Sequence, residues 1–134
     1  MDITKNDPAN RIDLPYVSIT RDGTIICFQY KENTELGFPE IRELINCAEI
    51  LSGNKPYVTF ADVRINISIT NEGKKVLSDM KNMPLFRGTA ALVKNDLYKF
   101  AANFMNSFNK PEYPFRAFTS KEEAMEWLRS LPLN

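Results

Sequence analysis

The stretch YVSITRDGTIICFQY, residues 16–30, decides the fold. Two runs rich in β-branched and aromatic residues, Tyr16–Thr20 and Thr24–Tyr30, flank the tripeptide Arg-Asp-Gly at 21–23. Aspartate and glycine accept the positive φ angles that a tight turn requires, so the stretch predicts a β-hairpin. The hairpin contributes one antiparallel strand to the sheet that the following residues build.

Helical and strand patterns alternate after the hairpin. Apolar residues recur at helical spacing over about residues 39–52 and predict an amphipathic helix that ends at Gly53. Tyr57–Ala61 (YVTFA) is apolar throughout, which is typical of a strand buried on both faces. The same reasoning predicts strands at 88–94 and 114–118, and helices opening at Thr70 or Asn71, spanning Leu97–Phe108, and opening after Thr119 or Ser120.

The stretch Val63–Thr70 fits two descriptions. Its isoleucines alternate with polar residues, which is the period of a strand. Joined to Tyr57–Asp62, it would form a strand far longer than the usual five or six residues. We therefore expect a strand that ends near Asp62, an extended connection, and a helix capped by Thr70.

Strands alternating with helices imply parallel pairing and right-handed crossovers. The predicted fold class is α/β: a β-hairpin followed by αβαβαβα, with a mixed, mostly parallel five-stranded sheet and four helices. The polar residues 1–13 are expected to form a flexible N-terminal arm, and residues 14–134 a single domain, in keeping with a chain of 134 residues.

Composition excludes several chemistries. The chain has 17 Lys and Arg residues and 17 Asp and Glu residues. Because it has no excess of positive charge, nucleic acid is not expected as a partner. The chain has no histidine, which removes Ser-His-Asp catalysis and His-ligated metal sites. Neither glycine-rich phosphate motif occurs. We expect no enzymatic activity and no cofactor.

The two cysteines, Cys27 and Cys47, are too few for a tetrahedral zinc site. The first ten residues lack the apolar run of a signal peptide, and no stretch is long and apolar enough for a membrane span. A cytoplasmic location is therefore expected, with both thiols unbridged and packed among apolar side chains.

Two groups of residues are candidate contacts. The first follows a buried strand, where open α/β sheets place their sites, and is the candidate contact for a protein partner. The competing interpretation is that the isoleucines of this segment simply cover the sheet. The group consists of Asp62, Arg64, Asn66, Ser68 and Thr70.

The second group lies on the helix predicted at 97–108. Leu97, Phe100, Phe104 and Phe108 follow helical spacing and are expected to face the core. Tyr98, Ala102 and Met105 widen the apolar stripe beyond one face. They are the candidate contacts of an apolar ligand or of a second copy in a homodimer, unless they pack beneath the loop 110–115.

The chain resembles the STAS-like superfamily of bacterial anti-sigma-factor antagonists, and a branch of it related to the CRAL-TRIO lipid carriers. The resemblance covers about residues 16–131. It is carried by the hairpin with its Arg-Asp-Gly turn, Asp62-Val63-Arg64, Ser68-Ile69-Thr70-Asn71-Glu72, the strand Thr89–Lys94, Pro114–Phe118, and Glu123–Leu128.

The resemblance implies a STAS-like fold and a regulatory role. Antagonists of the family carry Asp-Ser-Ser/Thr-Gly after the third strand, and a partner kinase phosphorylates the serine. Here Asp62 matches the aspartate, but the nearest hydroxyls are those of Ser68 and Thr70. We expect a non-enzymatic interaction module with an unknown protein partner. The alternative is a domain that binds a small apolar ligand or lipid through the aromatic third helix.

Overall fold

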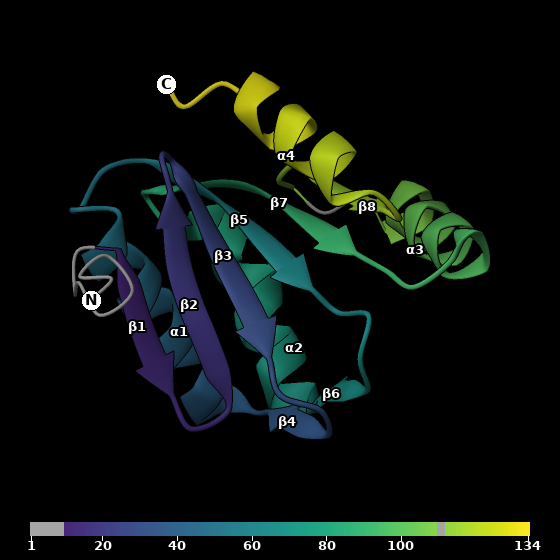
Figure 1. Cartoon of the computed structure of the whole chain (residues 1–134), viewed down its shortest axis with the longest axis horizontal. Helices are drawn as coiled ribbons and strands as arrows, with labels where there is room; N and C mark the ends of the chain where they lie inside the picture. The colour runs from purple at the N-terminus through teal and green to yellow at the C-terminus, as the bar shows by residue number, and fades with distance from the viewer. Residues whose placement is uncertain (1–9, 110–111) are drawn as a thin grey trace, which may run out of the picture.

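The computed structural model describes residues 10–109 and 112–134, with side chains from 104 to 109 left out. Six strands form one sheet in the order β1-β2-β3-β5-β7-β8, and only β2 runs against the others (Figure 1). The STAS-like α/β fold is confirmed, with one strand more than expected. The strands are β1 Arg11–Leu14, β2 Val17–Asp22, β3 Ile25–Tyr30, β5 Tyr57–Asp62, β7 Phe86–Leu92 and β8 Phe115–Phe118.

The predicted hairpin is present as β2 and β3, with Gly23 at a φ of 61° in the turn. The extra strand is β1, which pairs with β2 from Arg11 to Leu14. The predicted flexible arm of residues 1–13 was therefore wrong for residues 11–13, and residues 1–9 lie outside the described part of the chain. Backbone pairing with an exposed edge holds this polar segment in place.

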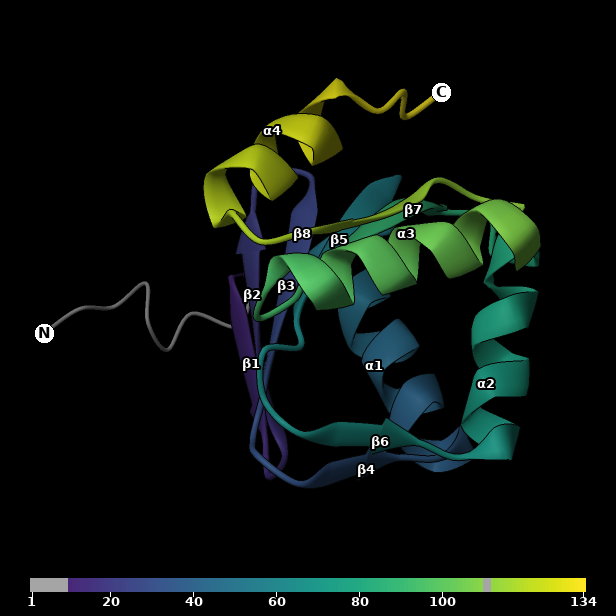
Figure 2. The same cartoon turned by 90° about the vertical axis from the view of Figure 1, so that its right-hand side faces the viewer.

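Helices cover the two faces of the sheet. Helices α1 (Phe38–Leu51) and α2 (Asn71–Ser78) lie on one face, while α4 (Lys121–Ser130) lies on the other (Figure 2). Side chains along each central strand point alternately to the face covered by α1 and α2 and to the face covered by α4. Tyr57 packs in the cluster with α1 and α2, whereas Val58 and Phe60 pack with Leu128 of α4.

The connection after β5 is extended, as expected, and contains a short strand, in line with the strand period of Val63–Thr70. β6 (Ile67–Ile69) pairs in parallel with β4 (Thr34–Leu36) in a separate two-stranded sheet. Helix α2 then begins at Thr70, whose Oγ1 accepts a hydrogen bond from the backbone N–H of Gly73 at 3.0 Å. This confirms the predicted cap.

Helix α3 (Asp96–Asn109) lies beside the edge strand β8. The side chain of Asn103 accepts a hydrogen bond from the backbone N–H of Ala117 at 2.9 Å and donates one to its carbonyl at 3.2 Å. The prediction that Leu97 and Phe100 face the core was wrong, because they are 74% and 68% exposed. These two bonds from Asn103 join α3 to β8, while the side chains of Phe104 and Phe108, also predicted to face the core, lie outside the described part of the structure.

Both cysteines are free, as expected. Cys47 is buried on α1, and Cys27 is half-buried on β3. Burial raises the pKa of both thiols, so neither is set up as a nucleophile at neutral pH.

Candidate functional site

Four small side chains form a flat patch at the centre of the sheet. Thr59 and Ala61 of β5 lie beside Thr89 and Ala91 of β7 in parallel register. Because side chains alternate along a strand, all four point to the face that α1 and α2 cover. The helices rest on larger residues around this patch, so space remains above it.

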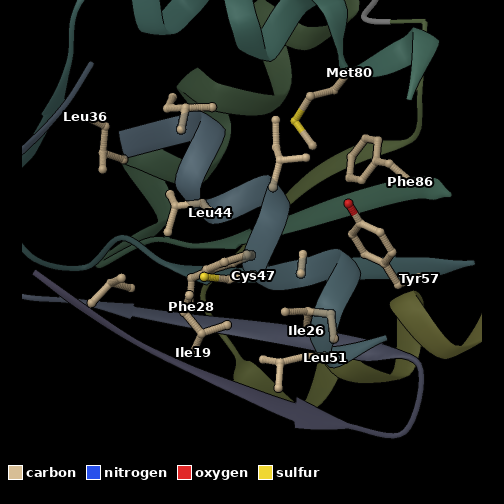
Figure 3. Close-up of a cluster of buried hydrophobic side chains, with 14 of the residues drawn as sticks. Ile19, Ile26, Phe28, Leu36, Leu44, Cys47, Leu51, Tyr57, Met80 and Phe86 are labelled. Atoms are coloured by element: carbon tan, nitrogen blue, oxygen red, sulfur yellow. The ribbon is translucent and has the colours of Figure 1, made fainter. Parts of the chain in front are cut away.

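That space is an apolar cavity of about 300 Å³ between the sheet and the helices. Its walls include Leu36, Leu44, Tyr57, Met80 and Phe86, which Figure 3 shows lying around one space. They come from β4, α1, β5, the 3₁₀ helix Asp79–Asn82 that follows α2, and β7. The remaining lining residues are Phe28, Tyr30, Ile41, Ile45, Ala48, Thr59, Ala61, Val63, Ile67, Ile69, Leu77, Thr89, Ala91, Tyr113 and Phe115.

The cavity opens where its lining residues are only half-buried. These include Val63 and Ile67 from the connection after β5, Leu77 of α2, and Tyr113 and Phe115 at the start of β8. A small molecule would therefore enter between the connection after β5, α2 and the segment leading into β8.

The lining contains no charged side chain among the described residues. Its polar groups are hydroxyls. Thr59 donates a hydrogen bond to Thr89 at 2.7 Å between the oxygens, and the tyrosines 30, 57 and 113 complete the set. Burial raises the pKa of Tyr57 to about 12, so its hydroxyl stays protonated at neutral pH.

Asp62 does not face this cavity. It is 5% exposed on the opposite face of β5, and its carboxylate accepts hydrogen bonds from the Arg64 side chain at 2.7 and 2.9 Å and from the Arg64 backbone at 3.2 Å. Gln29 donates a further bond at 3.4 Å. Burial alone would raise the pKa of Asp62, but the bonds and charge of Arg64 outweigh it and lower the pKa. The pair fixes the start of the connection.

The other residues of the first candidate group lie on or just after the connection that follows β5, and they differ in exposure. Arg64, Asn66 and Ser68 are exposed and form an outer polar row. Thr70 is half-buried and its hydroxyl caps α2. The alternating residues of the inner row, Val63, Ile65, Ile67 and Ile69, pack against the core. Three of them line the cavity, so the segment both covers the sheet and presents polar groups outward.

The second candidate group is not brought to the cavity. Tyr98 is 50% exposed and Ala102 is half-buried, and neither is a lining residue. The side chain of Met105 lies outside the described part of the structure. Of this group, Tyr98 and Ala102 thus lie apart from the cavity between the sheet and α1.

The sequence contained a signal for this site that its analysis missed. Thr59 and Ala61, and likewise Thr89 and Ala91, are spaced by two within strands predicted to be buried. Small residues that share one face of two adjacent strands leave volume that larger residues would fill. The register that places the two pairs side by side is a property of the sheet and cannot be read from either strand alone.

Comparisons with known proteins support the fold. A solved structure of an uncharacterized protein from the DUF3478 family, with a SpoIIAA-like fold, from Shewanella loihica PV-4, superposes with a TM-score of 0.57. The two share 19% identity over 84% of this chain and 91% of that one. A comparison with curated proteins gave no match.

Among the described residues, no helix is both long and apolar enough to cross a membrane, and no three acidic or cysteine side chains gather into a metal site. A family model matches residues 18–132, nearly the whole of the domain. The chain belongs to the family described as the domain of unknown function DUF7793.

Proposed function

We propose that this protein is a non-enzymatic binding domain that holds a small apolar molecule between the sheet and helices α1 and α2. The observation that carries the proposal is the apolar cavity of about 300 Å³. Ligand pockets in proteins begin at about this size and are lined mainly by apolar and aromatic side chains. The two free thiols are in keeping with a cytoplasmic location.

Energetics favour an occupant. The side chains that line the cavity lack packing partners on the side that faces it. A molecule that fills the space restores the missing packing contacts, so binding has a large favourable term available to it.

The test is binding of N-phenyl-1-naphthylamine, a neutral probe whose fluorescence rises in apolar surroundings. Wild-type protein is expected to bind one probe per chain. Ala61→Phe and Ala91→Phe place a ring into the cavity from adjacent strands and are expected to abolish binding. The matched control is Ala101→Phe, at an exposed position of α3.

Circular dichroism establishes that each variant is folded before it is scored. Two folded cavity variants that bind the probe as tightly as wild type would place the binding site elsewhere. Absence of probe binding to the wild type would dismiss the proposal directly.

A second candidate function is protein interaction, favoured by apolar side chains exposed on α3. Leu97 and Phe100 are more than half exposed, and Tyr98 is 50% exposed. If this surface mediates homodimerisation, light scattering will report a dimer that Leu97→Glu dissociates and that the control Ile50→Glu, at an exposed apolar position of α1, preserves. A monomer at every concentration contradicts the homodimer.

The outer polar row offers a surface for a different protein partner. A pull-down from the native cell would identify it. Arg64→Glu combined with Ser68→Asp is expected to weaken that complex, whereas Glu49→Lys on α1 leaves it intact. A folded double variant with unchanged affinity would place the contact outside the connection after β5.

A further inference from the structure

Two hydroxyls in the cavity, those of Tyr30 and Tyr57, make no hydrogen bond with any described residue. Tyr57 is the more deeply buried of the two, at 1% exposed against 9% for Tyr30. Figure 3 shows the Tyr57 hydroxyl turned toward Met80 and Phe86, which line the cavity with it. A buried donor without a partner is costly, and native proteins rarely leave one unused.

We propose that the cavity selects a neutral ligand with an acceptor oxygen, such as a ketone, ester or ether, and that this oxygen accepts a hydrogen bond from the Tyr57 hydroxyl. The inference rests on the proposed function and adds the chemistry of the ligand. A pure hydrocarbon fills the same volume but leaves the phenol unpaired. The oxygenated ligand satisfies it.

The ligand is neutral because nothing in the described lining compensates a charge. The lining holds no lysine, arginine, aspartate or glutamate. The burial that raises the pKa of Tyr57 to about 12 disfavours a phenolate there, and it disfavours a carboxylate or phosphate for the same reason. A fatty-acid head group or a phospholipid head group would have to remain outside.

Volume sets the size of the ligand. A cavity of 150 Å³ accommodates benzene in another protein, so about 300 Å³ suits a molecule of roughly two fused or linked rings. The shape contributes as well. The rings of Tyr57, Phe86 and Tyr113 form a chain of edge-on contacts along one wall, with centroids 6.2 and 5.0 Å apart. Aromatic faces and edges favour a planar guest.

The experiment uses three naphthalenes of similar shape, measured by displacement of N-phenyl-1-naphthylamine from the full chain. They are 2-ethylnaphthalene, 2-acetylnaphthalene and 2-naphthoate. Tyr57→Phe is expected to weaken the binding of 2-acetylnaphthalene by about fivefold, because one hydrogen bond is lost. The binding of 2-ethylnaphthalene to this variant is expected to be unchanged or tighter. The affinity of each ligand is compared between wild type and variant, so the free energy of transferring that ligand out of water cancels.

Tyr16→Phe is the matched control, since the Tyr16 hydroxyl bonds to Glu43 outside the cavity. Both neutral ligands are expected to bind this variant as they bind wild type. 2-Naphthoate is expected not to displace the probe from any of the proteins.

Four results would overturn the inference while leaving the proposed function intact. The first is equal weakening of the ethyl and acetyl compounds by Tyr57→Phe, and the second is no weakening of either. The third is displacement of the probe by 2-naphthoate as readily as by 2-acetylnaphthalene. Sensitivity of the acetyl compound to Tyr30→Phe alone would move the acceptor to that phenol and refute the assignment to Tyr57. Failure of the probe itself to bind wild type refutes the proposed function instead.

Discussion

At the residue scale, the buried carboxylate of Asp62 depends on a partner that is itself half in solvent. Arg64 supplies three of its hydrogen bonds, although the Arg64 side chain is 55% exposed. Despite the opposing effect of burial, these bonds and the guanidinium charge hold the pKa of Asp62 below its ordinary 3.8. A carboxylate whose pKa is lower in the folded state stabilises the protein at pH values above its unfolded-state pKa. This stabilisation is lost as the pH falls through the folded-state pKa.

We therefore predict that Arg64→Gln lowers the free energy of unfolding at pH 7. The difference from wild type narrows as the pH falls from the folded-state pKa of Asp62 in the variant, which burial raises, to that in wild type, which Arg64 lowers, because Asp62 is then protonated in both proteins. Urea denaturation at a series of pH values measures this. A difference that stays constant into strong acid would show that Arg64 acts through packing instead.

Gly73 has a steric reason to stand in the first turn of α2. A Cβ added there would lie 2.6 Å from the carbonyl oxygen of Leu36 and 3.1 Å from a methyl group of Ile69. Gly73→Ala is predicted to destabilise the fold by about 1–3 kcal/mol, the usual cost of overpacking. Lys74→Ala, exposed in the same turn, is the control and should be near neutral. Equal midpoints in urea for the two variants would contradict the steric argument.

At the scale of elements, the docking of α4 rests on two neighbouring side chains with different burial. Leu128 is 1% exposed, whereas Trp127 is half-buried against the ring of Phe118 at 5.7 Å. We predict that Leu128→Ala costs about 3 kcal/mol and Trp127→Ala about 2 kcal/mol, because only part of the larger ring is withdrawn from water. Thermal unfolding measures both, with exposed Glu126→Ala as the control. The reverse order would mean that the ring carries the docking.

The elements that the sequence predicted well are those whose pattern is local. The hairpin around Gly23 and the helix ending before Gly53 were confirmed because turn chemistry and helical spacing are written in adjacent residues. Strands β1 and β4 were missed, since each is short and exists only by pairing with another segment. For helix α3, Leu97 and Phe100 were predicted to face the core but are exposed, and it is Asn103 that hydrogen-bonds to the backbone of Ala117.

At the scale of the whole molecule, the candidate site belongs to no single element. Its floor comes from two strands, its walls from α1 and α2, and its mouth from the connection after β5 and the start of β8. Local patterns identify which residues are buried, but not how far apart the layers rest. The cavity therefore escaped prediction, although the small residues that create it were visible.

Occupancy of the cavity should be coupled to the stability of the whole fold. A ligand that binds only the folded state at a hundred times its Kd adds about 2.7 kcal/mol to the free energy of unfolding. We predict this increase for wild type with N-phenyl-1-naphthylamine, and none for Ala61→Phe. Urea denaturation with and without the probe checks it. An equal increase in both proteins would indicate binding outside the cavity.

The central strands β5 and β7 use one face for the packed core and the other face for the cavity. Val58, Phe60 and Leu92 pack in the core cluster on the side of α4, whereas Ala61 and Ala91 line the cavity on the opposite face. Exchanging alanine for glycine or valine at those two positions would resize the chamber without touching the opposite layer. Related proteins would then keep the same fold and bind ligands of different size. The residues at positions 61 and 91 would indicate the width of the ligand in each of them.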